Sequence, residues 1–208
     1  MPPRRPKNPA APPVARDWPV AVLAAVGAAV SLYLTVLKLA GGAALFCEAG
    51  TGCDIVQASR WATFLGLPTA AWGAALYVAL LVLALSGLSP RRWIWAFALA
   101  SAGVAFSAYL TGVSLVVLRA TCPWCLLVAA VGLVTFLTLL VRRPAVTGKR
   151  APTRPARVAT VGIAAAALTV VFAAGVWVMD SPTGSGAFAE RLARHLATTD
   201  AVMYGAFW

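Results

Sequence analysis

Charged residues are scarce in this sequence. Only 11% of its 208 residues are Asp, Glu, Lys or Arg, whereas 61% are hydrophobic. A water-soluble domain usually carries about a quarter charged residues, so the composition argues against a soluble globular protein. It also excludes an intrinsically disordered chain, because disordered segments are poor in apolar residues. We therefore predict a small integral membrane protein whose charges lie in its loops.

Acidic residues are the rarer of the two charge types. Six Asp and Glu stand against 17 Lys and Arg, which gives a formal net charge of +11. Such an excess would suggest a nucleic-acid partner if the basic residues formed one patch on a soluble fold. Here they are spread between apolar segments, so we expect membrane lipid around the protein and no nucleic-acid partner.

Five segments are long and apolar enough to cross a bilayer as helices. A hydrocarbon core of roughly 30 Å needs about 20 apolar residues. The five segments are residues 18–40, 67–88, 93–118, 122–141 and 158–178. Because backbone polar groups cannot stay unpaired in lipid, these segments should pack as a compact helical bundle. The predicted fold class is an all-α integral membrane protein.

The basic residues divide unequally between the two sides of this arrangement. The N-terminal side carries twelve of the 17: Arg4, Arg5, Lys7, Arg16, Arg91, Arg92, Arg142, Arg143, Lys149, Arg150, Arg154 and Arg157. The other side carries Lys38, Arg60, Arg119, Arg191 and Arg194. Cytoplasmic loops are enriched in Lys and Arg. We therefore predict that the N-terminus is cytoplasmic and the C-terminus external, as an odd number of spans requires.

Cysteine is also rare, and its placement is the strongest functional signal in the sequence. Cys47 and Cys53 lie in the first external loop, and Cys122 and Cys125 lie at the start of the fourth segment. With the predicted topology, all four are on the oxidising side of the membrane, where disulfides can form. No cysteine falls in a predicted cytoplasmic loop.

The Cys122-Pro123-Trp124-Cys125 motif is typical of a helix start. Thr121 or Cys122 is expected to cap the helix, and Pro123 fits its first turn because the missing N–H has no partner to lose there. The two sulfurs then lie on one helix face. A helix N-terminus favours the thiolate, which can attack a disulfide or add to an electrophile such as a quinone.

Cys47 and Cys53 flank the sequence EAGTG, whose two glycines indicate a flexible loop suited to a pair that exchanges between partners. Two alternatives stay open. The four cysteines can form two static disulfides, although a C-x-x-C bridge closes a very small loop and stabilises little. They can also bind zinc, but the C-x5-C spacing is wide for a zinc site. We favour a relay of exchanging dithiols and assign no metal site.

Over residues 18–141 the sequence resembles the bacterial homologues of vitamin K epoxide reductase. The similarity is carried by the loop cysteine pair, by the C-x-x-C motif, and by the segment Ser59-Arg60-Trp61-Ala62-Thr63-Phe64-Leu65-Gly66-Leu67-Pro68. The resemblance implies a catalytic four-helix transmembrane bundle that encloses a quinone beside the C-x-x-C pair. A short amphipathic helix, here residues 54–60, would cover the quinone.

The resemblance further implies an electron relay that generates disulfides. A reduced thioredoxin-like protein, separate or fused, would pass electrons outside the cytoplasm to the loop pair, first to Cys47. Cys53 would then exchange with Cys122, and Cys125 would reduce the quinone, either menaquinone or ubiquinone. The implied location is the inner or plasma membrane of a bacterial cell.

Five residues are predicted to contact the quinone. Ser59 would hydrogen-bond near a quinone carbonyl, and the neighbouring Trp61 and Phe64 would wall the pocket beside Cys125. Tyr109, in the third segment, can either contact the quinone or bond to a neighbouring helix, and the same two uses are open to Thr111.

Two other functions are kept as alternatives. The first is epoxide reduction, but vertebrate members of the family have a Tyr four residues after the second active cysteine, where this chain has Ala129. The second is a non-catalytic membrane scaffold or transporter that is stapled by two disulfides. A scaffold gains little from a C-x-x-C pair at a helix start, so we favour the oxidoreductase.

Outside the four-helix domain we predict a disordered basic N-terminus over residues 1–17 and a basic cytoplasmic loop over residues 142–157. The apolar segment that follows the N-terminus is too long for a cleaved signal peptide. A fifth transmembrane helix spans residues 158–179. Residues 180–208 are expected to form a linker and the truncated start of a thioredoxin-like domain, which follows a fifth span in some bacterial members.

Overall fold

The computed structural model describes residues 16–42, 44, 45, 47, 50–144, 153–179, 191, 194 and 195. The predicted disordered N-terminus lies almost wholly outside these residues. So do the middle of the predicted basic loop and most of the tail that resembles the start of a thioredoxin-like domain.

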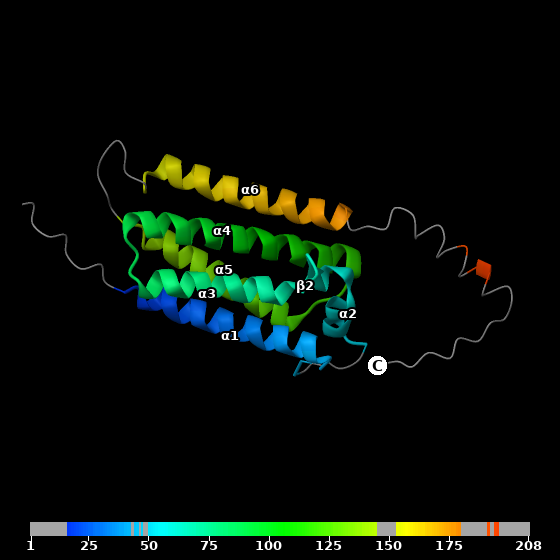
Figure 1. Ribbon diagram of the computed structural model, residues 1–208. Helices are drawn as coiled ribbons and strands as arrows, with labels where there is room; N and C mark the ends of the chain where they lie inside the picture. Colours follow the sequence, from blue (N-terminus) through cyan, green and yellow to red (C-terminus); the bar gives the residue numbers. More distant parts are fainter. Residues whose placement is uncertain are drawn as a thin grey trace, which may run out of the picture.

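Helices make up nearly all of the described structure (Figure 1). The α-helices are α1 (Trp18–Ala40), α2 (Gly52–Ala58), α3 (Thr69–Leu85), α4 (Pro90–Val113), α5 (Pro123–Val141) and α6 (Pro155–Met179). A 3-10 turn, η1 (Arg60–Ala62), follows α2, and a π-helical segment, η2 (Ser114–Leu118), continues α4. The short strands β1 (Thr63–Phe64) and β2 (Leu67–Pro68) pair in antiparallel fashion. This confirms the all-α fold class.

Among the described residues, four helices are long and apolar enough to cross a membrane: α1, α4 together with η2, α5 and α6. The second predicted span, residues 67–88, is shorter than expected, because α3 has only 17 residues. At 1.5 Å per residue it is about 26 Å long, slightly less than a bilayer core. The apolar hairpin that precedes α3 exposes Leu65 and Leu67 and so lengthens the apolar surface of this segment.

The boundaries of α3 and α4 correct the predicted ones. The predicted span 67–88 begins two residues late, at Thr69, because Leu67 and Pro68 pair with β1 through a left-handed turn at Leu65 and Gly66. Conversely, α4 begins three residues before the predicted Trp93. The Ser89 hydroxyl accepts a hydrogen bond from the Arg92 N–H and caps this helix, as serine commonly does.

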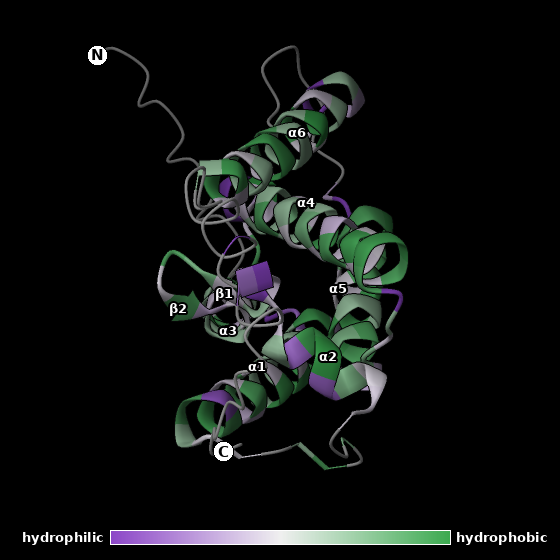
Figure 2. Cartoon of the chain, turned by 90° about the vertical axis from the view of Figure 1, so that its right-hand side faces the viewer, coloured by the Kyte–Doolittle hydropathy of each residue, from purple (hydrophilic) through white to green (hydrophobic). Residues whose placement is uncertain are grey.

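The helices α1, α3, α4 and α5 form a four-helix bundle, and α6 lies outside it. Within the bundle, α1 packs on α3 and α5, while α4 packs on α5 and α3. Helix α6 packs along the outer side of α4, as the end-on view shows (Figure 2). Hydrophobic residues make up most of the length of these helices (Figure 2), as lipid contact requires. The predicted four-helix bundle with an additional fifth helix is therefore confirmed.

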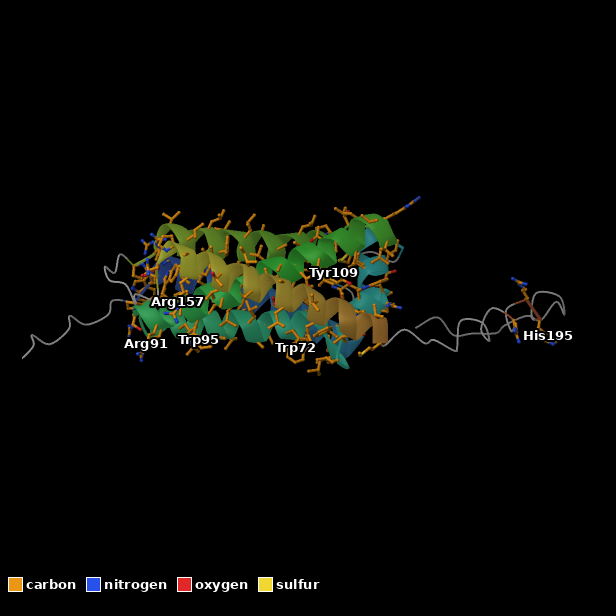
Figure 3. The ribbon with its side chains drawn as sticks, turned by 90° about the horizontal axis from the view of Figure 1, so that it is seen from above. Trp72, Arg91, Trp95, Tyr109, Arg157 and His195 are labelled. Atoms are coloured by element: carbon orange, nitrogen blue, oxygen red, sulfur yellow. A yellow bond between two sulfur atoms is a disulfide. The ribbon has the colours of Figure 1, made fainter. Side chains whose placement is uncertain are left out.

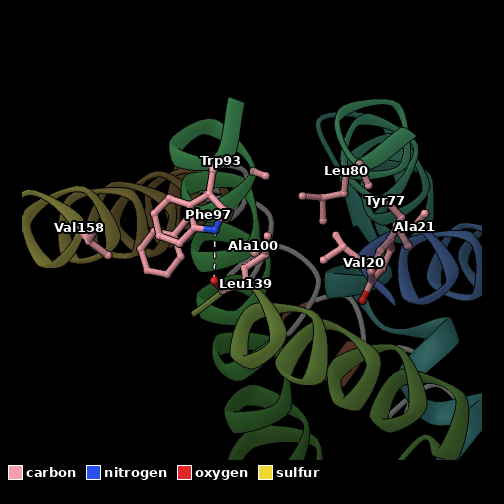
Figure 4. Packing of buried hydrophobic residues seen from close by; sticks show 12 residues of the cluster. Val20, Ala21, Tyr77, Leu80, Trp93, Phe97, Ala100, Leu139 and Val158 are labelled. Carbon is pink, nitrogen blue, oxygen red and sulfur yellow. Dashed lines mark hydrogen bonds between the residues drawn. The ribbon is translucent and has the colours of Figure 1, made fainter. Parts of the chain in front are cut away.

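The core of the bundle contains a satisfied polar group among large apolar side chains (Figure 4). Trp93 is 1% exposed, stacks on Phe97, and donates from Nε1 to the carbonyl of Leu139 on α5 at 3.1 Å. An unpaired indole N–H would be costly here, because no water is present to satisfy it. Helices α1 and α3 approach closely at Gly27, where an added Cβ would lie 2.4 Å from the Tyr77 ring.

The two ends of the bundle differ in chemistry. Arg91 and Arg157 lie at the end where α1 and α6 begin (Figures 1 and 3). At the same end, Arg142 forms an ion pair of 3.0 Å with Asp17. Helix α2, the hairpin and the start of α5 lie at the opposite end (Figure 1). All four cysteines are therefore at the end remote from this basic group.

Candidate active site: two cysteine pairs beside an apolar cavity

Cys122 is the N-cap residue of α5, one of the two predicted caps. Its sulfur accepts a hydrogen bond from the Cys125 backbone N–H at 3.3 Å, and Pro123 occupies the first helical turn. The preceding loop is held by Ser114 of η2, whose carbonyl accepts from the Ala120 N–H and whose hydroxyl donates to the Ala120 carbonyl. The start of α5 therefore fixes the position of the Cys122 thiol.

The loop pair is joined in a disulfide, Cys47–Cys53, with a Cα–Cα distance of 5.4 Å. Cys122 and Cys125 are free thiols, so the structure does not contain the two static bridges considered above. Cys53 is 2% exposed, whereas Cys47 is 9% exposed. Cys47 is therefore the more accessible end of the disulfide.

The two pairs meet at Cys53 and Cys122, whose sulfur atoms are 3.7 Å apart. Both side chains are buried with Cys47 in one cluster, which Trp124 also contacts. Trp124 donates from Nε1 to the Leu45 carbonyl at 2.8 Å and thereby connects α5 to the loop that carries Cys47. The geometry brings one sulfur of each pair to within reach of thiol–disulfide exchange.

The environment of Cys122 favours its thiolate. A hydrogen bond from the Cys125 thiol, together with the backbone N–H groups of Cys125 and Trp124, lowers the pKa of Cys122 to about 7 despite its burial. Donors at a helix N-terminus stabilise negative charge on the sulfur. Cys122 is therefore the better nucleophile of the C-x-x-C pair, and it lies next to the disulfide.

A largely apolar cavity lies between α1, α2, α3, α4 and α5. Its volume of about 160 Å³ is far more than the roughly 10–15 Å³ that one water needs. Cys122 and Cys125 both line it, so the free dithiol faces the space directly. Apolar walls with a few placed polar groups are typical of a site for a small organic ligand.

Three of the five predicted quinone-contact residues line this cavity: Ser59, Trp61 and Cys125. Ser59 follows α2, and its hydroxyl donates to the Val56 carbonyl at 2.7 Å. Arg60 lies with its guanidinium carbon 4.8 Å from the centre of the Trp61 ring. The predicted cover, residues 54–60, is present as α2 but begins two residues earlier.

The other two predicted contacts, Phe64 and Tyr109, lie elsewhere. Phe64 is 7% exposed, with its ring centre 5.1 Å from that of Trp177, and Tyr109 stacks on Trp177 at 5.6 Å. The physical reason is the position of α6, which presents Trp177 to both rings. The hairpin turns Phe64 towards α4 and α6 and away from the dithiol.

Two polar residues of the cavity, Ser107 and Ser114, were not assigned to it from the sequence, whereas Thr111 was considered as a quinone contact together with Tyr109. Ser107, Thr111 and Ser114 line it from α4 and η2. Their i, i+4, i+7 spacing places them on one helix face, a signal that the sequence does contain. Lys38 also lines the cavity and donates from Nζ to the Gln57 carbonyl near the end of α2. In the part of the chain that the structure describes, no three His, Cys, Asp or Glu residues cluster as metal ligands would.

Fold and site together define a class: an all-α, multi-pass membrane protein with a reduced dithiol at the wall of an apolar cavity and a second cysteine pair in contact with it. Residues 18–140, more than half of the chain, match the family model described as "Vitamin K epoxide reductase family". The chain belongs to that family. It is therefore a member of an oxidoreductase family whose enzymes use quinones as electron partners. Helix α6 lies outside the matched residues.

Proposed function

We propose that this protein oxidises the dithiol of an extracytoplasmic thioredoxin-like partner, separate or fused, and passes the electrons through its two cysteine pairs to a quinone. The product for the cell is a disulfide bond. The observation that carries the proposal is the contact between Cys53 and Cys122, with Cys125 beside them on the cavity wall.

The first step takes place at the more accessible end of the loop disulfide. A thiolate of the partner attacks Cys47, which is more accessible than Cys53, and the Cys47–Cys53 bond breaks. The second partner thiol resolves the mixed disulfide. Two electrons and two protons have then passed from the partner dithiol to Cys47 and Cys53, and the partner leaves with a disulfide.

The second step is internal exchange. When Cys122 and Cys125 form a disulfide, the Cys53 thiolate attacks Cys122 across the short gap between the two sulfurs, and Cys125 leaves as the thiol. Cys47 then attacks Cys53, which restores the loop disulfide and frees Cys122. The observed arrangement, with the loop pair oxidised and the C-x-x-C pair reduced, is the product of this step.

The third step reoxidises the C-x-x-C pair. The cavity fits a quinone because it is mostly apolar, opens onto both thiols, and carries hydroxyl groups that can bond to carbonyl oxygens. Bound there, a quinone accepts two electrons and two protons and leaves as a hydroquinone. Cys122 and Cys125 supply both electrons and both protons as they form their disulfide, so the overall reaction balances with no further reductant.

The proposed sidedness follows from the charge distribution. Arg91, Arg157 and the Arg142–Asp17 pair are at one end of the helices, and the cysteines are at the other. The positive-inside rule assigns the basic end to the cytoplasm. The cysteines then face the oxidising compartment of a bacterial inner or plasma membrane, where a thioredoxin-like partner can reach Cys47.

The proposal is tested with the purified full chain in lipid nanodiscs, without oxygen. Menaquinone or ubiquinone is supplied, a reduced thioredoxin-like protein is added, and quinone absorbance is followed. We expect quinone reduction with one partner disulfide formed per quinone, and its loss in both Cys125→Ser and Cys47→Ser. Dithiothreitol in place of the partner should still support turnover of Cys47→Ser, because it can reduce the C-x-x-C pair directly. Full quinone reduction by Cys125→Ser would contradict the assignment.

A further inference from the structure

The last turn of α6 contacts the segment that borders the cavity. Although α6 lies outside the bundle and outside the residues matched to the family, Trp177 near its end is only 2% exposed. The next residue, Val178, is 69% exposed. Helix α6 also buries Val158 and Ala173, and Trp177 is the largest of the three side chains that it inserts into the protein.

Two hydrogen bonds hold Trp177 in place, one donated by its side chain and one accepted by its backbone carbonyl. Trp177 donates from Nε1 to the Thr63 carbonyl at 3.2 Å. Arg60 donates from Nη2 to the Trp177 carbonyl at 2.8 Å. That carbonyl is in the last turn of α6, where carbonyls lack an intrahelical partner and a guanidinium is a favourable donor.

The same indole supports the cavity wall from outside. Its ring stacks on Phe106 of α4 with a centroid distance of 6.0 Å and an interplanar angle of 17°, and Phe106 lines the cavity. On the hairpin side, Arg60 lies over the ring of Trp61, which also lines the cavity. Trp177 therefore backs one wall residue directly and a second through Arg60.

We infer that Trp177 and Arg60 are positioning residues for the quinone cavity. Through them, α6 holds the wall residues Trp61 and Phe106 in place. The inference rests on the proposed quinone site. The reacting sulfurs are on α2, α5 and the external loop, whereas α6 packs on α4. Loss of the Trp177 contact should therefore weaken quinone binding and leave thiol exchange intact.

The central experiment compares Trp177→Ala with Trp95→Ala in the full chain. Trp95 is also a tryptophan of a membrane helix, but it is 68% exposed and lies towards the basic end (Figure 3). We expect Trp177→Ala to raise the KM for quinone about tenfold, which corresponds to ~1.4 kcal/mol, with kcat changed less than about twofold. Trp95→Ala should behave as the wild type.

A second measurement does not depend on turnover. Equilibrium binding of a short-chain quinone to the fully oxidised protein should show the same loss of affinity in Trp177→Ala. The exchange between Cys53 and Cys122 in this variant, measured by trapping the mixed disulfide, should proceed at the wild-type rate. If the wild-type protein binds quinone but does not reduce it when the reduced partner is added, the proposed relay fails. The binding data alone then decide the role of Trp177.

Arg60→Gln keeps the inference testable if Trp177→Ala does not fold. This variant leaves the indole in place but removes the guanidinium from Trp61 and from the Trp177 carbonyl. We expect a severalfold rise in quinone KM and partial recovery in Arg60→Lys, which retains the charge but not the fork geometry. Wild-type quinone affinity in folded Trp177→Ala or Arg60→Gln protein would overturn the inference and leave α6 as a membrane anchor only.

Discussion

Cys53 and Cys122 are 69 residues apart in the chain, yet their sulfur atoms are 3.7 Å apart in the fold. Cys53 is at the same time bonded to Cys47, and Cys122 is held by the start of α5. One sulfur thus belongs to a disulfide and its neighbour is a thiol with a lowered pKa. This contact connects the surface loop to the cavity.

The contact predicts which mixed disulfide accumulates when the relay is interrupted. In Cys125→Ser, the Cys122 thiolate can attack Cys53, but no second thiol remains in the C-x-x-C pair to resolve the bond. We expect a Cys53–Cys122 disulfide, detected by mass spectrometry of the digested, alkylated protein, and a free thiol at Cys47. Cys122→Ser is the matched control and should retain Cys47–Cys53. Accumulation of Cys47–Cys122 instead would contradict the proposed order.

The lowered pKa of Cys122 predicts the pH dependence of its reactivity. The thiolate fraction rises as pH increases through the pKa of about 7, so alkylation should be slow near pH 5.5, half-maximal near the pKa, and level off above about pH 8. In a Cys47→Ser, Cys53→Ser background, where Cys122 cannot be trapped as a mixed disulfide, Cys125→Ala removes the largest stabilising contact, the thiol hydrogen bond, and should move the midpoint to higher pH. The rate is measured with iodoacetamide and peptide mass spectrometry. An unchanged midpoint in Cys125→Ala would contradict this cause.

The long helices could be predicted from the sequence because each contains about 20 successive residues that are mostly apolar. Cys122 before Pro123 also marks the start of α5. The Ser89 cap before Pro90 was missed, so the predicted start of α4 was three residues late. The short hairpin was not predicted, because Thr63–Pro68 is as apolar as the span that follows and its turn depends on positive φ at Leu65 as well as at Gly66.

The cavity walls were only partly predictable for a different reason. Ser59, Trp61 and Cys125 are close in sequence to motifs that identify the site, whereas the surroundings of Phe64 and Tyr109 depend on which helix α6 packs against. Hydropathy reveals that α6 is apolar but not where it docks. The sequence does contain the Ser107–Thr111–Ser114 spacing, but a polar face on a membrane helix equally suits bonding to a neighbouring helix.

Thr111 provides a test of the polar face of the cavity. Replacement by Val keeps the shape of the side chain and removes its hydroxyl. If that hydroxyl bonds to a quinone carbonyl, the loss of about 1 kcal/mol should raise the quinone KM roughly fivefold. Steady-state kinetics with dithiothreitol as the reductant measure this. Thr169→Val, on α6, is the control, because its hydroxyl bonds to the Ala165 carbonyl and does not line the cavity. An equal effect in both variants would indicate a change in helix packing.

Gly52 tests whether the close approach of α2 to α5 controls the exchange step. A Cβ at this position would lie 2.7 Å from the carbonyl oxygen and 2.9 Å from the backbone nitrogen of Thr121, directly before Cys122. These are backbone atoms, so Gly52→Ala should push α2 outwards and separate Cys53 from Cys122. If overpacking raises the barrier to exchange by about 1–3 kcal/mol, the mixed disulfide should form roughly fivefold to more than a hundredfold more slowly.

The exchange rate is measured in the Cys125→Ser background by quenching with acid and quantifying the Cys53–Cys122 peptide over time. Gly112→Ala is the matched control, since a Cβ there meets no atom within 4 Å and alanine is also the better helix former. It should exchange at the rate of the parent protein. A wild-type rate in Gly52→Ala would mean that α2 moves freely enough to absorb the methyl group, and that the tight packing at Thr121 does not set the distance across which the two cysteine pairs exchange.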